Sequence, residues 1–273
     1  MSNFNMQLEV DTRQQGFSLV EMAIVIVILG FVIGALLLPL QVQRNQLAQS
    51  QTENTLELAN RALLGYAQAN GRLPCPATNN GTSIFPDDSS NANPLAGGQC
   101  DKQLGFLPAA TLGLEPTDLE GYLVDAWGNR IMYAVAQSST TSTPTNTATP
   151  DFTTNNATDG LAIVGMGNLI PELRICSSST GITTLACSGA SPETNYLINN
   201  AVAVIYSIGS TGSEVAGGAD ESANPILPTT LKKVFVSHEP RSADDPNGEF
   251  DHIVTWISPY VLYNAMIEAG QLH

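Results

Sequence analysis

The stretch Gly16–Leu40 reads GFSLVEMAIVIVILGFVIGALLLPL and carries a single charged residue, Glu21. A helix of about 20 consecutive apolar residues is long enough to cross the hydrocarbon core of a bilayer. An ionised side chain inside such a helix is costly, so an intramembrane acid is by default a functional residue with a partner. The stretch therefore predicts a membrane-spanning helix over residues 17–40 in which Glu21 needs a positively charged partner.

A new amino terminus would supply that partner. If the chain is cut between Gly16 and Phe17, the α-amino group of Phe17 can pair with the Glu21 carboxylate of a neighbouring copy as two helices pack. The string Gly16-Phe17-Ser18-Leu19-Val20-Glu21, followed by an apolar run, resembles the class III signal of type IV pilins and type II secretion pseudopilins. The resemblance implies that prepilin peptidase removes the leader, residues 1–16, that Phe17 becomes N-methylated, and that Glu21 directs filament assembly.

The alternatives for this segment are an ordinary signal anchor and a secretory signal peptide. A secretory signal has a shorter apolar core followed by an A-x-A-like cleavage site, and neither feature is present. The leader departs from the resemblance in its charge. It contains Glu9, Asp11 and only Arg13, whereas such leaders are usually held in the cytoplasm by net positive charge. The expected orientation of the helix in the membrane therefore depends on the class III signal and not on the charge of the leader.

The chain as a whole is acidic, with a formal net charge of −15 at pH 7. Such a surface repels phosphate backbones, so no nucleic-acid partner is expected. The resemblance instead implies other pilin or pseudopilin subunits, prepilin peptidase, an inner-membrane assembly platform and the membrane as partners. It also implies a single-pass inner-membrane protein with a periplasmic head that later enters a pilus or pseudopilus.

The first helix is expected to continue past the membrane as an amphipathic segment, residues 41–70. Leu56, Ala59, Leu63 and Tyr66 recur at helical spacing among polar residues and predict one buried stripe. Gly71 and two nearby prolines then end the helix. We expect this half of the helix to pack on the domain that follows.

Residues 71–273 are long enough to form one globular head with its own core. The expected strands are Arg130–Ala136, Leu161–Val164, Ala201–Ser207, Lys233–Ser237 and Phe250–Ile257. A polar run, Ser138–Gly160, predicts an exposed loop, and Ser258-Pro259 predicts the start of a terminal helix. The expected fold class is α+β, with a long N-terminal helix packed on an antiparallel β-rich, pilin-like head.

Four cysteines, Cys75, Cys100, Cys176 and Cys187, lie on the side of the membrane where disulfides form. Three pairings are open to four cysteines, and we favour Cys75–Cys100 with Cys176–Cys187 because each closes a short polar loop. Loops of this size contribute about 3 kcal/mol each in the chain-entropy model. Zinc is the competing interpretation, but no C-x-x-C pair and no neighbouring histidine supports it.

Two segments of the head resemble the major pseudopilin of type II secretion. The segment Asp125-Ala126-Trp127-Gly128-Asn129, with Tyr133 further on, is similar to its D-P-W-G-N-x-x-x-Y stretch, and Val204–Gly212 is similar to the strand and glycine turn before its acidic loop. The residues of the first segment indicate a packing corner, with a ligand site as the alternative.

Pseudopilins of this type often hold calcium in that acidic loop, so calcium is the one cofactor that the resemblance raises. Calcium needs six to eight oxygen ligands on a flexible loop. The competing interpretation is a solvated turn, since Asp-Pro-Asn-Gly is itself a turn signal. The candidate ligands are Asp220, Glu221, Asp244, Asp245 and Asp251, with Glu214, Asn247 and Glu249 nearby.

Catalytic motifs are weak. The three histidines, His238, His252 and His273, belong to no H-E-x-x-H motif and lie beside no G-x-S-x-G elbow. The sequence therefore predicts a structural subunit of a type IV pilus or type II secretion pseudopilus, and the large head favours a minor subunit. The alternatives are an adhesive or ligand-binding pilus subunit and a membrane-anchored periplasmic hydrolase.

Overall fold

The computed structural model describes most of the head and the helix that precedes it. The described residues are 18–77, 102–136, 152–153, 161–167, 169–190, 194–212, 217–229 and 232–272, without the side chains of 35–42, 162 and 163. The chain forms two compact units, Met1–Gln46 and Leu47–His273.

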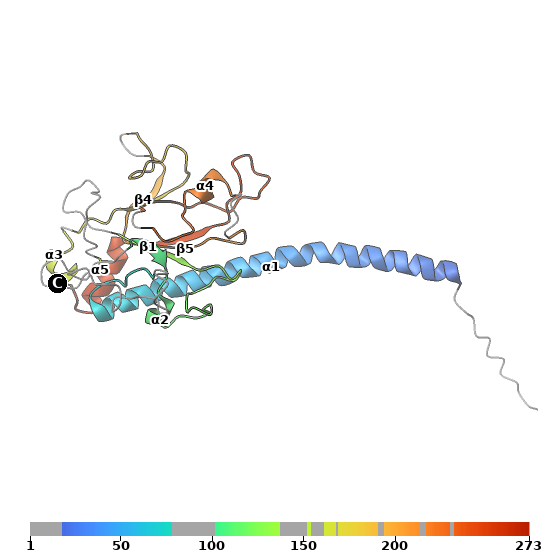
Figure 1. Ribbon diagram of the computed structural model, residues 1–273, viewed down its shortest axis with the longest axis horizontal. Coiled ribbons are helices and arrows are strands. Elements are labelled where there is room, and N and C mark those ends of the chain that lie inside the picture. Colours follow the sequence, from blue (N-terminus) through green and yellow to red (C-terminus); the bar gives the residue numbers. More distant parts are fainter. Residues whose placement is uncertain are drawn as a thin grey trace, which may run out of the picture. The chain divides into compact units, whose positions relative to one another are not determined.

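A single long helix, α1 (Leu19–Asn70), begins in the first unit and ends in the second (Figure 1). It ends where the sequence predicts, because Gly71 adopts a left-handed backbone conformation with φ of 69° and donates its N–H to the Ala67 carbonyl. In the described part of the chain, no helix combines the length and the apolar character that crossing a membrane requires.

The described residues of the second unit form two β-sheets. The larger sheet has the order β1-β2-β5-β7 and is antiparallel throughout. Its strands are β1 (Leu104–Phe106), β2 (Met132–Val135), β5 (Ala203–Ser207) and β7 (Ile253–Ile257). The smaller sheet has the order β4-β3-β6, in which β3 pairs antiparallel with β4 and parallel with β6. Its strands are β3 (Leu173–Cys176), β4 (Tyr196–Ala201) and β6 (Val234–Val236).

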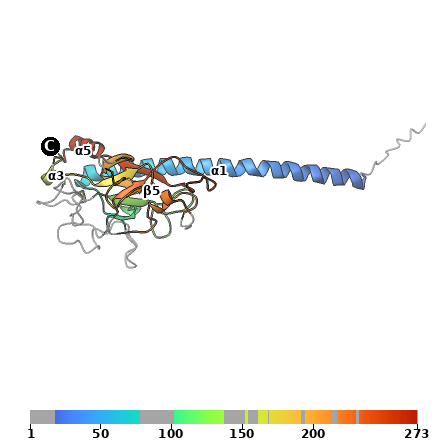
Figure 2. The same cartoon turned by 90° about the horizontal axis from the view of Figure 1, so that it is seen from above.

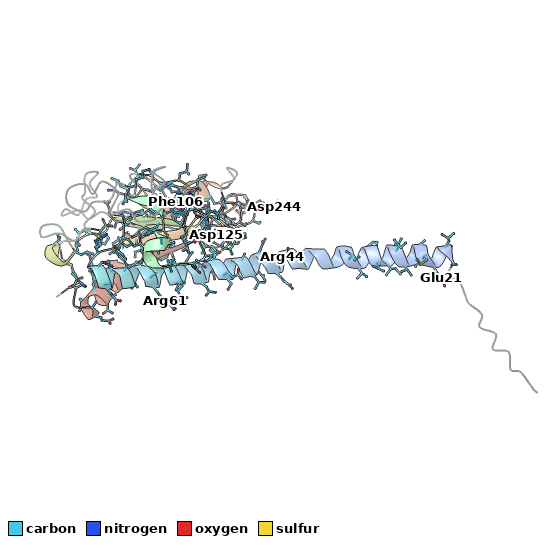
Figure 3. The ribbon with its side chains drawn as sticks, turned by 60° about the horizontal axis from the view of Figure 1, so that its bottom comes forward. Glu21, Arg44, Arg61, Phe106, Asp125 and Asp244 are labelled. Carbon is cyan, nitrogen blue, oxygen red and sulfur yellow. A yellow bond between two sulfur atoms is a disulfide. The ribbon has the colours of Figure 1, made fainter. Side chains whose placement is uncertain are left out.

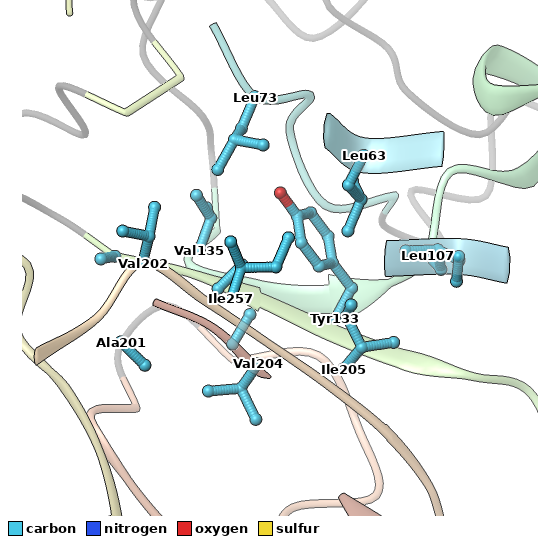
Figure 4. Packing of buried hydrophobic residues seen from close by; sticks show 14 of the residues in the cluster. Leu63, Leu73, Leu107, Tyr133, Val135, Ala201, Val202, Val204, Ile205 and Ile257 are labelled. Carbon is cyan, nitrogen blue, oxygen red and sulfur yellow. The ribbon is translucent and has the colours of Figure 1, made fainter. Parts of the chain in front are cut away.

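The second half of α1 packs on the larger sheet through the expected stripe. Leu56, Ala59 and Leu63 are buried, and Ala67 replaces the half-buried Tyr66 as the last buried position. Figure 4 shows Leu63 in the same apolar cluster as Tyr133 of β2, whose hydroxyl donates to the Pro74 carbonyl at 3.1 Å. The fold is therefore α+β, with an N-terminal helix followed by a largely antiparallel head.

The described part of the head also has four short helices: α2 (Ala109–Leu112), α3 (Leu161–Val164), α4 (Ala219–Ser222) and α5 (Pro259–Glu268). Helix α5 begins as expected, with the Ser258 hydroxyl accepting the Val261 N–H. It lies beside the end of α1, where Gln68 donates to the Ala265 carbonyl at 3.1 Å (Figure 2). The expected terminal helix is thus present and closes the core against α1.

Several sequence predictions differ from the structure. The expected strand at Leu161–Val164 is the helix α3, because an apolar run of four residues has no period that separates helix from strand. Strands β1 and β3 were not predicted because they have only 3 and 4 residues, and β4 was not predicted because its sequence, YLINNA, does not alternate. The run Ser138–Gly160 lies outside the described residues except for Phe152 and Thr153, which are buried rather than exposed.

Candidate functional site

The start of α1 carries the residue expected to direct assembly, Glu21 (Figure 3). Gly16 and Phe17, the expected cleavage and methylation residues, lie outside the described residues. The Ser18 N–H donates to Glu21 Oε2 at 3.0 Å, and the Glu21 N–H donates to Ser18 Oγ at 3.2 Å. This reciprocal pair is a capping box, which the S-x-x-E spacing of Ser18 and Glu21 could have revealed in the sequence. Glu21 therefore caps its own helix and stays exposed.

The first turns of α1 expose a nearly continuous apolar surface. Extended exposed apolar surface marks a site of protein or membrane contact. The side chains concerned are all at least 49% exposed: Leu19, Val20, Met22, Ile24, Val25, Ile26, Val27, Ile28, Leu29, Phe31, Val32 and Ile33. The helix start thus combines one acid with a surface suited to burial in a larger assembly.

The segment Asp125–Asn129 forms a tight corner around a buried carboxylate. Asp125 Oδ1 accepts the N–H groups of Trp127 at 2.9 Å and Asn129 at 2.8 Å, while Oδ2 accepts the Ser207 hydroxyl at 2.6 Å. The Asn129 side chain donates to the Gly209 carbonyl at 2.8 Å. Burial raises the pKa of Asp125, and the hydrogen bonds that its carboxylate accepts offset only part of that rise. The contacts are those of a packing corner, as the residue types indicate.

The glycine turn that follows β5 is attached to Asp251. Asp251 Oδ2 accepts the Ser210 hydroxyl at 2.8 Å and the Thr211 N–H at 2.8 Å. Gly209 has φ of 70°, and a Cβ there would lie 2.1 Å from Asp251 Oδ1, so only glycine fits. The Asp251 carboxylate therefore occupies the space that a side chain at position 209 would need. It also connects the turn after β5 with the residues just before β7.

The structure divides the candidate calcium ligands among three places. Asp220 contacts His238 and Arg241. Asp244 is exposed, and Asp245 Oδ1 accepts the Asn247 N–H at 2.8 Å within its own turn. Glu221 and Asp251 come together, and His252 joins them, with one ligand atom of each within 4.8 Å of the others. Glu214 lies outside the described residues.

His252 was not predicted to join this cluster. The sequence places Asp251 and His252 inside a strand, Phe250–Ile257, where neighbouring side chains point to opposite faces. In the structure β7 begins only at Ile253. Asp251 and His252 therefore lie before the strand, and their side chains need not point to opposite faces. Strand boundaries are set by pairing across the sheet, and the sequence alone does not place them.

Asn224 holds the His252 ring of this cluster in place. Asn224 Oδ1 accepts the Val236 N–H and Asn224 Nδ2 donates to the Val236 carbonyl, each at 2.8 Å, which fixes the orientation of the amide. Its second amide hydrogen then points to His252 Nδ1 at 3.3 Å and occupies that lone pair. With the amide in this orientation, the neutral ring carries its proton on Nε2. Burial lowers the pKa of His252 to about 4.

The carboxylates of the cluster are also largely occupied. Glu221 Oε1 accepts the Asp251 N–H at 2.8 Å, and Asp251 Oδ2 accepts three donors from Ser210 and Thr211. Asp251 Oδ1 is buried without a hydrogen-bond partner. Burial raises the pKa of Glu221, and the Glu221 and Asp251 carboxylates lie close enough together for Asp251 to raise it further.

Among the described residues, the favoured disulfide Cys176–Cys187 is present, with Cα atoms 5.4 Å apart. Cys75 is also disulfide-bonded. Its expected partner, Cys100, lies outside the described residues. The Cys176–Cys187 bridge follows β3 and closes the loop that carries Ser178 and Ser179.

His238 makes the one Asp–His ion-pair contact among the described residues, with Asp220. Its Nε2 lies 3.0 Å from Asp220 Oδ2, and its Nδ1 lies 2.7 Å from the Glu239 carbonyl oxygen. Both ring nitrogens thus lie against oxygen atoms of the head. The contact is therefore suited to holding segments together.

The comparisons with known proteins identify the start of the chain. Residues 11–37 match the family described as the prokaryotic N-terminal methylation motif. The chain therefore carries a class III prepilin signal, the signal of type IV pilins and pseudopilins. The comparisons with curated proteins and with solved structures found no match.

Proposed function

We propose that this chain is a minor structural subunit of a type IV pilus or of a type II secretion pseudopilus. The observation that carries the proposal is the match of residues 11–37 to the N-terminal methylation motif, on a helix that exposes an apolar surface. The α+β head with an N-terminal helix supports the same function. In this proposal the chain acts by packing against other subunits and catalyses no reaction.

Processing is the first step. Prepilin peptidase cuts after Gly16 and Phe17 is then N-methylated, while residues 17–40 anchor the precursor in the inner membrane with the head in the periplasm. Mass spectrometry of membrane-extracted protein should show a mature chain that starts at N-methyl-Phe17. A chain that keeps residues 1–16 in cells with active prepilin peptidase would refute the proposal.

Assembly then depends on the charge of Glu21 as well as on its capping role, and two substitutions separate them. Glu21→Gln keeps an acceptor for the Ser18 N–H but removes the charge that pairs with a neighbour's amino terminus. Ser18→Ala removes one half of the capping box and keeps the charge.

We expect both variants to insert and to be cleaved. Glu21→Gln should fail to enter filaments, whereas Ser18→Ala should enter them at nearly the parent level. Immunoblots of sheared filaments against membrane fractions measure this difference. If Glu21→Gln enters filaments normally, Glu21 acts only as a helix cap. That result would contradict the proposed pairing of its carboxylate with the amino terminus of a neighbouring subunit.

A further inference from the structure

Both faces of the larger sheet are covered within the head. On one face, Tyr206 of β5 packs on Phe235 of β6, with ring centroids 5.7 Å apart. On the opposite face, the Asn60 side chain of α1 donates to the Thr255 hydroxyl oxygen of β7 at 2.9 Å. Thr255 pairs with Ile205, whose side chain alternates with that of Tyr206. The larger sheet therefore lies between the smaller sheet and the second half of α1 (Figure 1).

Strand β7 lies at one edge of the larger sheet. Among the described strands it pairs with β5 alone. Natural proteins usually protect such an edge with charged side chains or proline, but β7 reads IVTWI and has neither. The backbone groups of β7 that point away from β5 are therefore suited to pairing with a further strand.

A groove of about 470 Å³ lies beside the start of β7, and all the residues named as its lining belong to the described part of the chain. Ile253 and Val254 of β7 line it, together with Gln49 and Glu53 of α1 and Leu197 of β4. Residues from the sheet edge and from both covering layers thus surround one space. The next strand of the larger sheet would occupy this space, and its volume is that of a small-ligand cleft.

The groove has an acidic lining. Glu53 and Glu239 are exposed there, and none of its described lining residues is lysine or arginine. Its two histidines contact other side chains of the head. A second copy of this edge would bring the same two acids, and its own covering layers would keep the two β7 strands apart. The groove therefore suits a single extended segment with cationic side chains.

We propose that this groove binds an extended segment of another protein, which adds a strand to the larger sheet beside β7. Alternate side chains of an added strand point to opposite layers. In the bound segment, lysine or arginine side chains lie toward Glu53 on α1, and apolar side chains lie toward Leu197 of the smaller sheet. Main-chain hydrogen bonds supply affinity in such strand addition, and side-chain contacts supply specificity. The inference does not depend on the proposed assembly function, and each can fail without the other.

The first test uses a short, capped, fluorescent peptide in which lysine and valine alternate. We expect it to bind the full chain in detergent, as measured by fluorescence anisotropy. The controls are the same peptide N-methylated on every second residue, in each of the two phases. They keep the charge and the side chains but obstruct backbone pairing on one edge of the peptide. At least one of them should bind roughly tenfold more weakly, because a few hydrogen bonds are lost.

The second test removes the acids of the groove. The double variant Glu53→Gln with Glu239→Gln should bind the peptide about fivefold more weakly, since two exposed ion pairs are lost. The matched control is Glu57→Gln with Glu268→Gln, which removes two exposed acids outside the groove. The control should bind like the parent, and thermal melts show whether each variant is folded.

A third test places a positive charge in the groove. Leu197→Lys should weaken binding by repelling the cationic side chains of the peptide, because Leu197 is 49% exposed in the lining. Leu227→Lys is the control, since Leu227 is 68% exposed and does not line the groove.

Hydrogen exchange locates the bound peptide on the parent without any variant. We expect saturating peptide to slow exchange of the β7 amide groups that point away from β5. The amide groups of β4, which forms an edge of the smaller sheet, should change less.

Three results would overturn the proposal. They are a parent that does not bind the alternating peptide at millimolar concentration, both N-methylated peptides binding as tightly as the parent peptide, and unchanged exchange in β7. The first would leave no site for a strand. The second would reduce the interaction to attraction between charges, and the third would place the peptide elsewhere on the acidic surface.

Discussion

At the scale of single residues, Glu221 makes the stability of the head depend on pH. Burial, together with the charges of Asp251 and Glu249, raises the pKa of Glu221 from 4.5 to about 7, despite the hydrogen bond from the Asp251 N–H. A carboxyl whose pKa is raised by folding binds more protons in the folded state. Its contribution to stability is therefore complete below pH 4.5 and is lost as the pH rises towards 7.

His252 has the opposite effect in an overlapping range. Burial lowers its pKa from 6.5 to about 4, so its contribution is complete above pH 6.5 and is lost as the pH falls towards 4. We expect Glu221→Gln to remove the loss of stability on the alkaline side and to leave the acid loss caused by His252. Thermal melts across this range, with exposed Glu239→Gln as the control, measure the change. A Glu221→Gln profile that parallels the parent would contradict this prediction.

Asp125 offers a second residue-scale prediction, because its carboxylate organises the corner that contacts β5. Asp125→Ala leaves the N–H groups of Trp127 and Asn129 without their acceptor, and we expect a loss of about 1–3 kcal/mol in the free energy of unfolding. Asp125→Asn should lose less, since its amide oxygen still accepts. Urea denaturation measures both, with exposed Asp244→Ala as the control (Figure 3).

At the scale of elements, α1 has one face that the head requires. Leu63 is fully buried against the sheet, whereas Leu58 is 49% exposed on the same helix. We expect Leu63→Ala to reduce the free energy of unfolding by about 2–5 kcal/mol, because it leaves a cavity in the core. Leu58→Ala is the matched control and should change it by less than about 0.5 kcal/mol. Equal losses would show that the two faces of α1 are not distinguished.

The loop after β3 is the element that the Cys176–Cys187 disulfide constrains. Replacing both cysteines by serine should reduce the free energy of unfolding by about 3 kcal/mol, because the unfolded chain gains freedom. Denaturation of this variant beside the parent, with and without reductant, measures the effect. Non-reducing peptide mapping of the parent should also show Cys75 linked to Cys100, and free thiols at all four positions would refute the expected export.

At the scale of the whole molecule, a packing subunit and an enzyme differ in where their essential residues lie. We expect alanine at His238, His252 or Asp251 to affect secretion or piliation only as far as it destabilises the head. A complementation assay of each variant beside a thermal melt of the full chain tests this. A histidine variant that melts like the parent and yet abolishes function would make the head catalytic or ligand-binding.

The sequence alone determined features that depend on neighbouring residues. The prepilin signal around Gly16 and Glu21, the end of α1 at Gly71 and the Ser258 cap each arise within a few residues of the chain. The buried stripe of α1 was also predictable, because helical spacing is a local property. Such features need only backbone geometry and the order of side chains.

Only the tertiary structure decided which acids meet which partners. Asp220 meets Arg241 across 21 positions, Glu221 meets Asp251 across 30, and Asp125 meets Ser207 across 82. These contacts depend on where strands begin and on how the sheets pair, as the late start of β7 at Ile253 shows for His252. The sequence gives no sign that these acidic residues differ. Their surroundings in the folded head decide whether each forms an ion pair, caps a turn or belongs to a buried hydrogen-bonded pair.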